Sequence, residues 1–247
     1  MIYDNTADTS PPEDHIKSYA LSKDQEPIPA SPNFGIDSPL GLLASNILAP
    51  LYLYATLKGK HQVWAEILDA LPDDLFKQPT LDVGCGRGMV LLKVAQRKKK
   101  ITESSTAPGV SVEQAYGIDI FNTGDQSGNS PLATYKNAAA MGVVDQTVLH
   151  TASFTERLPF ADNTFSLVTS SLAIHNVDGV GRANAMKEIM RVCLPGATVV
   201  IIDLQGYVKA HEKLAREHGW EAVEVQQVGM RMQFGLLPCQ VLRATKP

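Results

Sequence analysis

From residue 80 onward, short apolar runs alternate with longer segments in which apolar residues recur at helical spacing. The apolar runs predict strands at residues 80–84, 115–121, 146–152, 165–175, 197–204, 220–229 and 237–246. Helices are predicted between them at residues 89–100, 129–142, 181–193 and 206–219. This alternation is typical of a mostly parallel sheet with helices on both faces. The last two strands are joined without a helix, through residues 230–236, so we expect one of them to be antiparallel.

The first 72 residues have a different pattern. Residues 1–38 are rich in proline, serine and aspartate and predict a loose N-terminal arm. Residues 39–72 are apolar at helical spacing and predict a helical cover, which leaves residues 73–247 as the main domain. Residues 39–57 approach the length of a membrane span, but polar residues interrupt them. We expect this stretch to pack on the domain; association with a membrane surface is the alternative.

Composition narrows the class of protein. The 247 residues are 44% hydrophobic and 19% charged, which suits one large domain with a sizeable core. The net charge of −4 argues against a nucleic-acid partner, since such proteins need a basic face. Three widely spaced cysteines and a polar, acidic N-terminus predict a cytoplasmic protein. The six histidines show no ligand spacing, so no metal site is predicted, and the oligomeric state stays open.

A turn with alternating glycines follows the first strand of the predicted sheet. "TLDVGCGRGM" places Gly84, Gly86 and Gly88 between that strand and the next helix. A dinucleotide fingerprint has its third glycine one place later, where this chain has Met89. Asp82 would repel a pyrophosphate at this turn but attract an ammonium group. The turn therefore favours the amino-acid end of a ligand over a pyrophosphate.

A second acid ends the neighbouring strand. Asp119 in "YGIDIF" lies where a carboxylate can accept hydrogen bonds from both hydroxyls of a ribose. An amino-acid end and a ribose on adjacent strands together indicate S-adenosylmethionine as the cofactor.

The segments "LDVGCGRG", "GIDIF", "LPFADNTFSLVTSSLAIHNV" and "EIMRVCLPGATVVIID" resemble the class I S-adenosylmethionine-dependent methyltransferases. They are most similar to the ubiquinone/menaquinone-biosynthesis-like, small-molecule branch, and "DQSGN" at residues 125–129 resembles a subgroup of it. The resemblance covers about residues 79–205. It implies a Rossmann-like, seven-stranded α/β sheet in the order 3-2-1-4-5-7-6 and an enzyme that methylates a small molecule.

The resemblance also implies site residues. Asp82 would favour the amino group of the cofactor, Asp119 would hold the ribose and Ile120 would pack on the adenine. Ser127 and Asn129 would lie near the nucleoside, or else belong to a loop that caps a helix. The implied cofactor contacts in full are Asp82, Gly84, Cys85, Gly86, Gly88, Asp119, Ile120, Ser127, Asn129, Ser153, Phe154 and Ser170.

One position departs from the family pattern. The family usually has an acid before "LPF" that accepts a hydrogen bond from the adenine amine, but this chain reads "TASFTERLPF". Depending on the alignment, either Ser153 or Phe154 takes its place. A serine can still accept a hydrogen bond, whereas a phenylalanine can only stack or pack.

The end of the fourth strand carries the groups expected to face the transferred methyl. Among Ser170, Ser171, His175 and Asn176, we expect His175 to be the general base, because the ordinary pKa of histidine lies near physiological pH. The alternative is that His175 only shapes the pocket. The acceptor is expected to contact aromatic and methionine residues outside the segments that carry the family resemblance. These residues are Tyr19, Phe34, Tyr52, Tyr54, Met230, Met232 and Phe234.

Three functions are compatible with these residues. The first is methyl transfer to a small, apolar or aromatic metabolite. The second is methylation of protein or RNA, against which the acidic balance and the lack of an Asn-Pro-Pro-aromatic motif argue. The third is a regulator that binds the cofactor without turnover, suggested by the altered adenine position.

Overall fold

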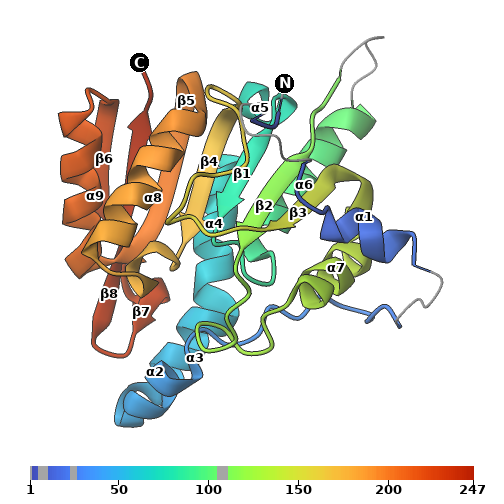
Figure 1. The fold of residues 1–247 in the computed structure, drawn as a ribbon. Helices are drawn as coiled ribbons and strands as arrows, with labels where there is room; N and C mark the ends of the chain where they lie inside the picture. Colours follow the sequence, from blue (N-terminus) through green and yellow to red (C-terminus); the bar gives the residue numbers. More distant parts are fainter. Residues whose placement is uncertain (1, 5–10, 23–26, 105–110) are drawn as a thin grey trace.

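A computed structural model describes residues 2–4, 11–22, 27–104 and 111–247. The sheet has the order β3-β2-β1-β4-β5-β8-β6, and a short β7 pairs with β8 (Figure 1). The strands are β1 (Thr80–Val83), β2 (Ala115–Asp119), β3 (Thr147–Thr151), β4 (Phe165–Ser171), β5 (Cys193–Leu204), β6 (Glu221–Gln227), β7 (Gln233–Phe234) and β8 (Leu237–Thr245). The α-helices are α1 (His15–Ala20), α2 (Pro39–Ala44), α3 (Ala49–Tyr54), α4 (Lys60–Asp69), α5 (Asp73–Lys77), α6 (Met89–Ser104), α7 (Pro131–Ala140), α8 (Gly179–Val192) and α9 (Gln205–Glu217).

The predicted Rossmann-like topology is confirmed, with one correction to the strand count. β1 to β5 pair in parallel, and β8 lies antiparallel between β5 and β6. The predicted order 3-2-1-4-5-7-6 becomes 3-2-1-4-5-8-6, because the predicted turn at residues 230–236 contains the two-residue strand β7. β5 also begins at Cys193, four residues before the predicted start at residue 197.

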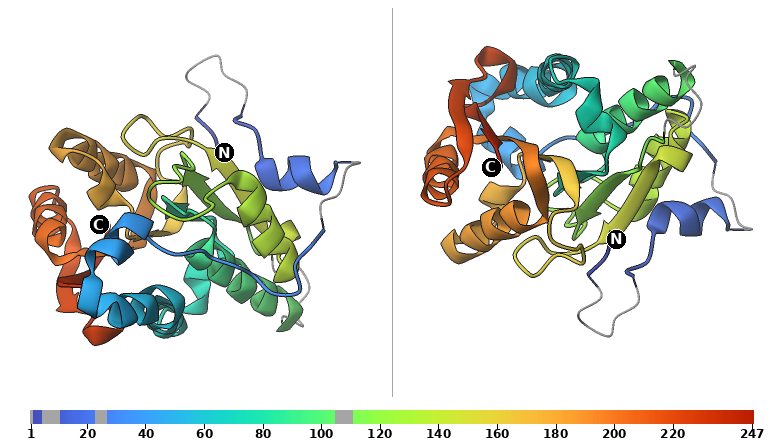
Figure 2. Two further views of the ribbon diagram at one scale, coloured as in Figure 1. Left: turned by 90° about the horizontal axis from the view of Figure 1, so that it is seen from below. Right: turned by 90° about the horizontal axis from the view of Figure 1, so that it is seen from above.

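Two hydrophobic layers cover the two faces of the sheet. On β5, Val200 and Ile202 belong to the layer under α4 and α6, while Val199 and Ile201 belong to the layer under α8. This alternation follows from the two-residue period of a strand, and because both faces are covered, the central strands are buried at nearly every position. Figure 2 shows α8 and α9 on one face of the sheet and α4 and α6 on the other.

The described part of the N-terminal arm, predicted as a loose segment of which part could be ordered over a site, contains regular structure. Tyr3 forms a β-bridge with Phe160, and the arm contains the helix α1. Ile16 of α1 is buried, and Asp14 caps the helix while accepting a hydrogen bond from the Leu149 N–H of β3. Helix α1 thus packs against the outer edge of the sheet, at β3 and α7.

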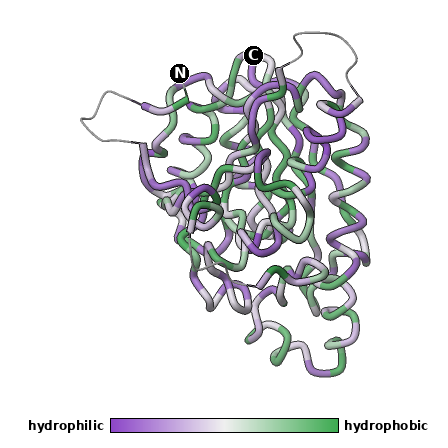
Figure 3. Tube along the Cα trace, turned by 90° about the vertical axis from the view of Figure 1, so that its right-hand side faces the viewer, coloured by the Kyte–Doolittle hydropathy of each residue, from purple (hydrophilic) through white to green (hydrophobic). Residues whose placement is uncertain are grey.

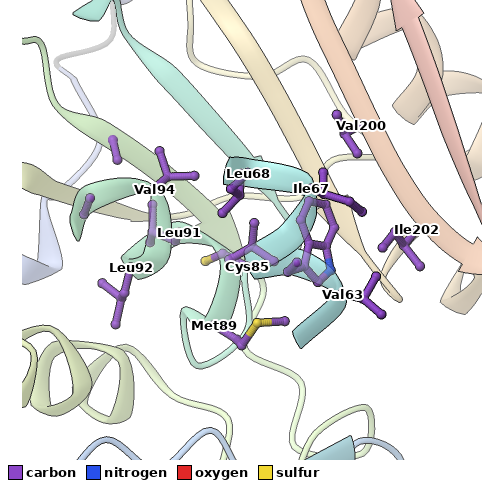
Figure 4. Close-up of a cluster of buried hydrophobic side chains, with 14 of the residues drawn as sticks. Val63, Ile67, Leu68, Cys85, Met89, Leu91, Leu92, Val94, Val200 and Ile202 are labelled. Atoms are coloured by element: carbon purple, nitrogen blue, oxygen red, sulfur yellow. The ribbon is translucent and has the colours of Figure 1, made fainter. Parts of the chain in front are cut away.

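The helical stretch predicted over residues 39–72 is present, but it is broken into short pieces. The segments η1 (Asn46–Leu48, a 3₁₀ turn) and η2 (Ala55–Gly59, a π turn) separate α2, α3 and α4. The segment at η2 passes so close to the C-terminal region that a Cβ on Gly59 would lie 1.7 Å from the Arg231 carbonyl oxygen. α4 then buries Val63, Ile67 and Leu68 against residues of α6 (Figure 4).

Within the described ranges of the chain, no helix combines the length and the apolar character that a bilayer crossing requires.

The start of α7 offers a test of local stability. Ser130 is the N-cap, and its hydroxyl accepts a hydrogen bond from the Ala133 N–H at 3.1 Å. Ser130→Ala is expected to lower the free energy of unfolding by about 1 kcal/mol, since it leaves that N–H without its partner. Urea unfolding measures the change. Ser104→Ala, at the end of α6, is the control and should change stability by less than about 0.5 kcal/mol.

Candidate active site

A cavity of about 680 Å³ opens at the carboxyl ends of β1, β2 and β4, where ligands bind in sheets of this kind. Eight of the predicted site residues line it: Asp82, Gly84, Cys85, Gly86, Asp119, Ile120, Asn129 and Phe154. His175 lines it as well, beyond the end of β4. The topology therefore brings the predicted glycine turn, ribose acid and general base to one hollow.

Other residues pack closely against the backbone of the glycine turn. Gly84 and Gly86 have φ values of +69° and +53°, which L side chains rarely adopt. A Cβ on Gly84 would lie 2.3 Å from the Ala173 Cβ, and one on Gly86 would lie 2.4 Å from the Gln126 Oε1. Glycine is therefore required at both positions for the turn to fit between β4 and the loop after β2.

Asp119 is surrounded by hydrogen-bond donors at the cavity wall. Its carboxylate accepts from the Gly86 N–H at 2.8 Å, the Phe121 N–H at 2.5 Å and the Asn129 Nδ2 at 3.2 Å. Burial raises its pKa, although these hydrogen bonds act in the opposite direction. The buried Oδ1 of Asn129 has no hydrogen-bond partner in the structure. Asp119 and Asn129 thus offer acceptor positions to a ligand that carries hydroxyl groups.

Asp82 is buried beneath the first turn of α6 and accepts a hydrogen bond from that turn. Its carboxylate accepts from the Thr169 hydroxyl at 2.7 Å and from the Leu91 N–H at 3.0 Å. Complete burial raises the pKa of Asp82 to about 7 despite these two bonds, and nearby Asp119 adds to the rise. Cys85 is also buried, and burial raises the pKa of its thiol, so it is not a reactive nucleophile. A carboxyl group that is partly neutral at pH 7 is a weak anchor for an ammonium group.

The structure separates the two residues that could replace the usual adenine acid. Phe154 lines the cavity, and its ring comes within 3.4 Å of the Cβ position of Gly84. The Ser153 hydroxyl instead bonds the Thr155 side chain at 2.8 Å and does not border the cavity. Ile120, which is more than half exposed, lines the cavity as well. Of the two candidates for the position of the family's usual acid, the cavity wall therefore has Phe154, and Ile120 adds a second apolar side chain to the lining.

Three other predicted contacts lie away from the cavity lining. The Ser170 hydroxyl donates to the Val83 carbonyl and ties β4 to β1. Gly88 directly precedes α6 and donates its N–H to the Cys85 carbonyl. Ser127 belongs to the "DQSGN" loop, where its hydroxyl accepts from the Ile36 N–H at 2.8 Å.

That loop binds the N-terminal segment at residues 33–38, which we call the strap. The Ser127 N–H donates a hydrogen bond to the Ile36 carbonyl, and Asp37 forms a β-bridge with Gln126. The Gln126 side chain accepts from the Arg87 N–H at 2.9 Å and donates to the Phe34 carbonyl at 2.8 Å. One amide therefore connects the strap to the glycine turn.

Removing this amide should loosen the strap. Gln126→Ala is expected to accelerate amide hydrogen exchange over residues 33–38 about tenfold, because two hydrogen bonds are lost. Exchange followed by mass spectrometry measures the change. Gln114→Ala removes a half-buried glutamine whose solvent-exposed hydrogen bond goes to the Asp145 carbonyl, and it should leave the strap unaffected. Unchanged exchange in Gln126→Ala would show that the backbone bridges alone hold the strap.

His175 has a buried partner that the sequence patterns did not reveal. Asp203, near the end of β5, accepts from the His175 Nδ1 at 2.5 Å and from its N–H at 3.1 Å. On the other side of Asp203, the buried His211 places its Nε2 3.6 Å from Oδ2. Burial raises the pKa of Asp203, but the bond from His175 and the nearby His211 outweigh it, so the pKa lies below its ordinary value. An ionised Asp203 fixes the His175 proton on Nδ1 and leaves Nε2 free to accept one.

The far end of the cavity is apolar. Ile47 and Leu48 of η1, Phe234 of β7, Leu236 of the β7–β8 turn and Leu237 of β8 line it. Ile47 and Leu236 are 93% and 83% exposed, so the apolar lining continues onto the surface. The tube in Figure 3 has green stretches, interrupted by white and purple ones, at the projecting lower end, where Figure 1 places α2.

The expected acceptor residues divide between this region and other parts of the structure. Tyr52 and Phe234 line the cavity, with ring centroids 5.1 Å apart. Met232 is buried in the core, and Met230 is exposed. The remaining three, which do not line the cavity, are Tyr19, Phe34 and Tyr54.

Comparisons with known proteins agree with this geometry. A methyltransferase domain model matches residues 81–201. A sterol 4-C-methyltransferase of Caenorhabditis elegans is 29% identical over 124 residues, which are 50% of this chain and 30% of that protein. The ubiquinone/menaquinone biosynthesis C-methyltransferase of Geotalea daltonii is 32% identical over 123 residues, or 50% of this chain and 44% of that protein. The matched regions thus span less than half of these two relatives.

A solved structure shows the same fold across most of the chain. Geranyl diphosphate methyltransferase in complex with S-adenosylmethionine has a TM-score of 0.55 and 13% identity, and the match covers 88% of this chain and 98% of that one. The sheet order, the glycine turn and the domain match lead to one family. The chain belongs to the class I S-adenosylmethionine-dependent methyltransferases.

Proposed function

We propose that this protein transfers the methyl group of S-adenosylmethionine to a small, apolar or aromatic metabolite. The single observation that carries the proposal is the continuous cavity from the glycine turn and Asp119, past His175, to an apolar rim at Ile47 and Leu236. A cofactor and an acceptor can therefore meet in one hollow.

The cofactor end of the cavity fits this donor. The unpartnered Asn129 Oδ1 and the Asp119 carboxylate supply acceptors for the ribose hydroxyls. Phe154 and Ile120 offer apolar surfaces to the adenine ring. The side-chain-free backbone at Gly84 and Gly86 leaves room for the methionine part.

The bound donor supplies an electrophilic methyl group on a sulfonium, and the protein aligns the acceptor and removes its proton. His175 is proposed to accept that proton at Nε2, which is free because Nδ1 donates to Asp203. The resulting imidazolium then pairs with the buried Asp203 carboxylate. An acceptor that carries a hydroxyl, an acidic N–H or an acidic C–H suits this arrangement.

The acceptor class rests on the lining of the far end. Apolar side chains from two distant parts of the chain enclose it, so an acceptor gains affinity by burying apolar surface. The two curated relatives named above carry sterol and quinone-pathway names, which is compatible with an apolar acceptor.

The test uses the purified full chain, S-adenosylmethionine labelled in the methyl group and a cell extract. The extract is divided into organic-soluble, aqueous small-molecule and macromolecular fractions. We expect label in an organic-soluble small product, and none with Asp119→Asn. Label that precipitates with protein or RNA would overturn the small-molecule assignment. Binding of the cofactor without a labelled product in any fraction would favour a regulator instead.

A further inference from the structure

A buried ion pair lies in the wall of the cavity. The Lys60 ammonium group is 2.7 Å from both carboxylate oxygens of Asp37, and the two side chains are 3% and 17% exposed. The Thr56 hydroxyl donates to Asp37 Oδ2 at 2.8 Å and accepts from the Asp37 N–H at 3.0 Å. Both Lys60 and Asp37 line the cavity. The pair is therefore held in place and borders the space that a ligand would fill.

Stability alone gives little reason for such a pair. Removing two charges from water carries a desolvation penalty that can exceed their mutual attraction, and apolar replacements are often as stable. Lys60 is also the only lysine or arginine among the residues that line the cavity in the described chain. A unique buried cation at a cavity wall indicates a ligand that carries a negative group.

The ion pair is close to the glycine turn. Asp37 forms a β-bridge with Gln126, and the Gln126 side chain accepts from the Arg87 N–H of the turn. The Gln126 Oε1 also lies 2.4 Å from the Cβ position of Gly86. Gln126 therefore contacts both Asp37 and the glycine turn, at which the methionine part of the cofactor is expected.

The amino-acid end of the cofactor carries one ammonium and one carboxylate group. Four acids of the described chain line the cavity: Asp37, Asp82, Asp119 and Asp125. Asp125 accepts a hydrogen bond from the Asn122 side chain at 3.2 Å and faces no cation among the described residues. Asp82 is fully buried and bonded to Thr169 and Leu91, and Asp119 is assigned to the ribose. Asp37 is more exposed and already directed at a cation. The oppositely charged pair thus matches a zwitterion in both signs.

We propose that Lys60 and Asp37 bind the amino-acid end of the cofactor, Lys60 its carboxylate and Asp37 its ammonium group. The proposal rests on the cofactor assignment made above. In the complex, one internal ion pair is exchanged for two ion pairs with the ligand, so the summed charge at this wall stays zero. The strap, which carries Asp37, becomes part of the cofactor site.

Comparing the binding of two ligands distinguishes recognition of the amino-acid end by this ion pair from a purely structural role of the pair. S-adenosylhomocysteine has the amino-acid end, whereas 5′-methylthioadenosine has the same nucleoside and sulfur without it. Lys60→Gln and Asp37→Asn are each expected to weaken binding of S-adenosylhomocysteine by about tenfold or more. Binding of 5′-methylthioadenosine should change by less than about twofold. Calorimetry on the full-length variants gives both affinities.

Two further variants are controls. Lys58→Gln removes an exposed lysine from the π turn η2, which directly precedes Lys60, and should leave both affinities unchanged. Lys60→Arg keeps the positive charge and should retain most of the S-adenosylhomocysteine affinity. If Lys60→Gln fails to fold in a thermal scan, Asp37→Asn, which conserves shape, carries the test.

The outcomes separate the two proposals. Equal weakening of both ligands, or no weakening of either, would overturn the role of the ion pair. If the wild-type protein bound both ligands with the same affinity, the pair would not recognise the amino-acid end, while the nucleoside site would remain. If the wild-type protein bound neither ligand, the cofactor assignment itself would fail, and this inference with it.

Discussion

Replacing Asp119 by asparagine is expected to weaken binding of S-adenosylhomocysteine about 100-fold. Three donors point at this carboxylate, from the Gly86 N–H, the Phe121 N–H and the Asn129 side chain. An asparagine has one acceptor oxygen and an NH₂ group, so at least one of these donors would face another donor. The ribose hydroxyls would also lose their charged acceptor. Calorimetry on the folded variant measures the loss.

A ligand that lacks a ribose hydroxyl tests whether the loss of affinity in Asp119→Asn comes from contacts with the ribose. Removing a ribose hydroxyl from the ligand should weaken binding to the wild-type protein but matter much less to Asp119→Asn, as in a double-mutant cycle. Asp145→Asn, at an exposed acid beside β3, is the matched control and should bind like the wild type. Wild-type affinity in Asp119→Asn would show that the carboxylate only supports the loop after β2.

The sheet was predictable because its signal is local. Thr80–Val83 and Ala115–Asp119 are buried at every position, and such short, mostly apolar runs bounded by turn residues are too short for helices. β7 was not predictable, since two residues carry no period. The start of β5 was also missed, because Pro195 and Gly196 suggest a turn although the strand pairing already begins at Cys193.

Site residues were predictable where topology alone places them. The ends of parallel strands meet at one edge of the sheet, so the residues near Gly84, Asp119 and His175 had to converge. A sequence motif does not show whether a side chain at the end of a strand points into the cavity. Ser170 follows Thr169 on β4, yet its hydroxyl bonds the Val83 carbonyl and does not reach the cavity.

The remaining site residues depend on contacts between distant segments. Asp203 looks like an ordinary strand end until the fold brings it to His175, 28 positions earlier in the chain. Asp37 and Lys60 are likewise 23 positions apart and meet only because the strap crosses the mouth of the cavity. No sequence period encodes such pairs, since they are products of tertiary packing.

The partnership of His175 and Asp203 gives the largest expected effect on catalysis. With the acceptor identified by labelling, His175→Ala should lower kcat about 1,000-fold, because proton removal loses its base. Asp203→Asn should lower kcat about 100-fold, since the amide keeps a hydrogen bond but not the charge that stabilises the imidazolium. Both variants should bind S-adenosylhomocysteine nearly as the wild type does, because neither residue is among the proposed cofactor contacts.

The pH dependence distinguishes a base from a residue that only shapes the pocket. Without His175, the acceptor must ionise by itself, so the rate of His175→Ala should rise with pH and approach that of the wild type as the acceptor deprotonates. A packing defect would lower the rate by the same factor at every pH. His218→Ala removes an exposed histidine of α9's C-cap and should leave kcat unchanged. A His175→Ala protein with wild-type kcat at neutral pH would mean that the acceptor needs no base, and that the bond to Asp203 serves the structure alone.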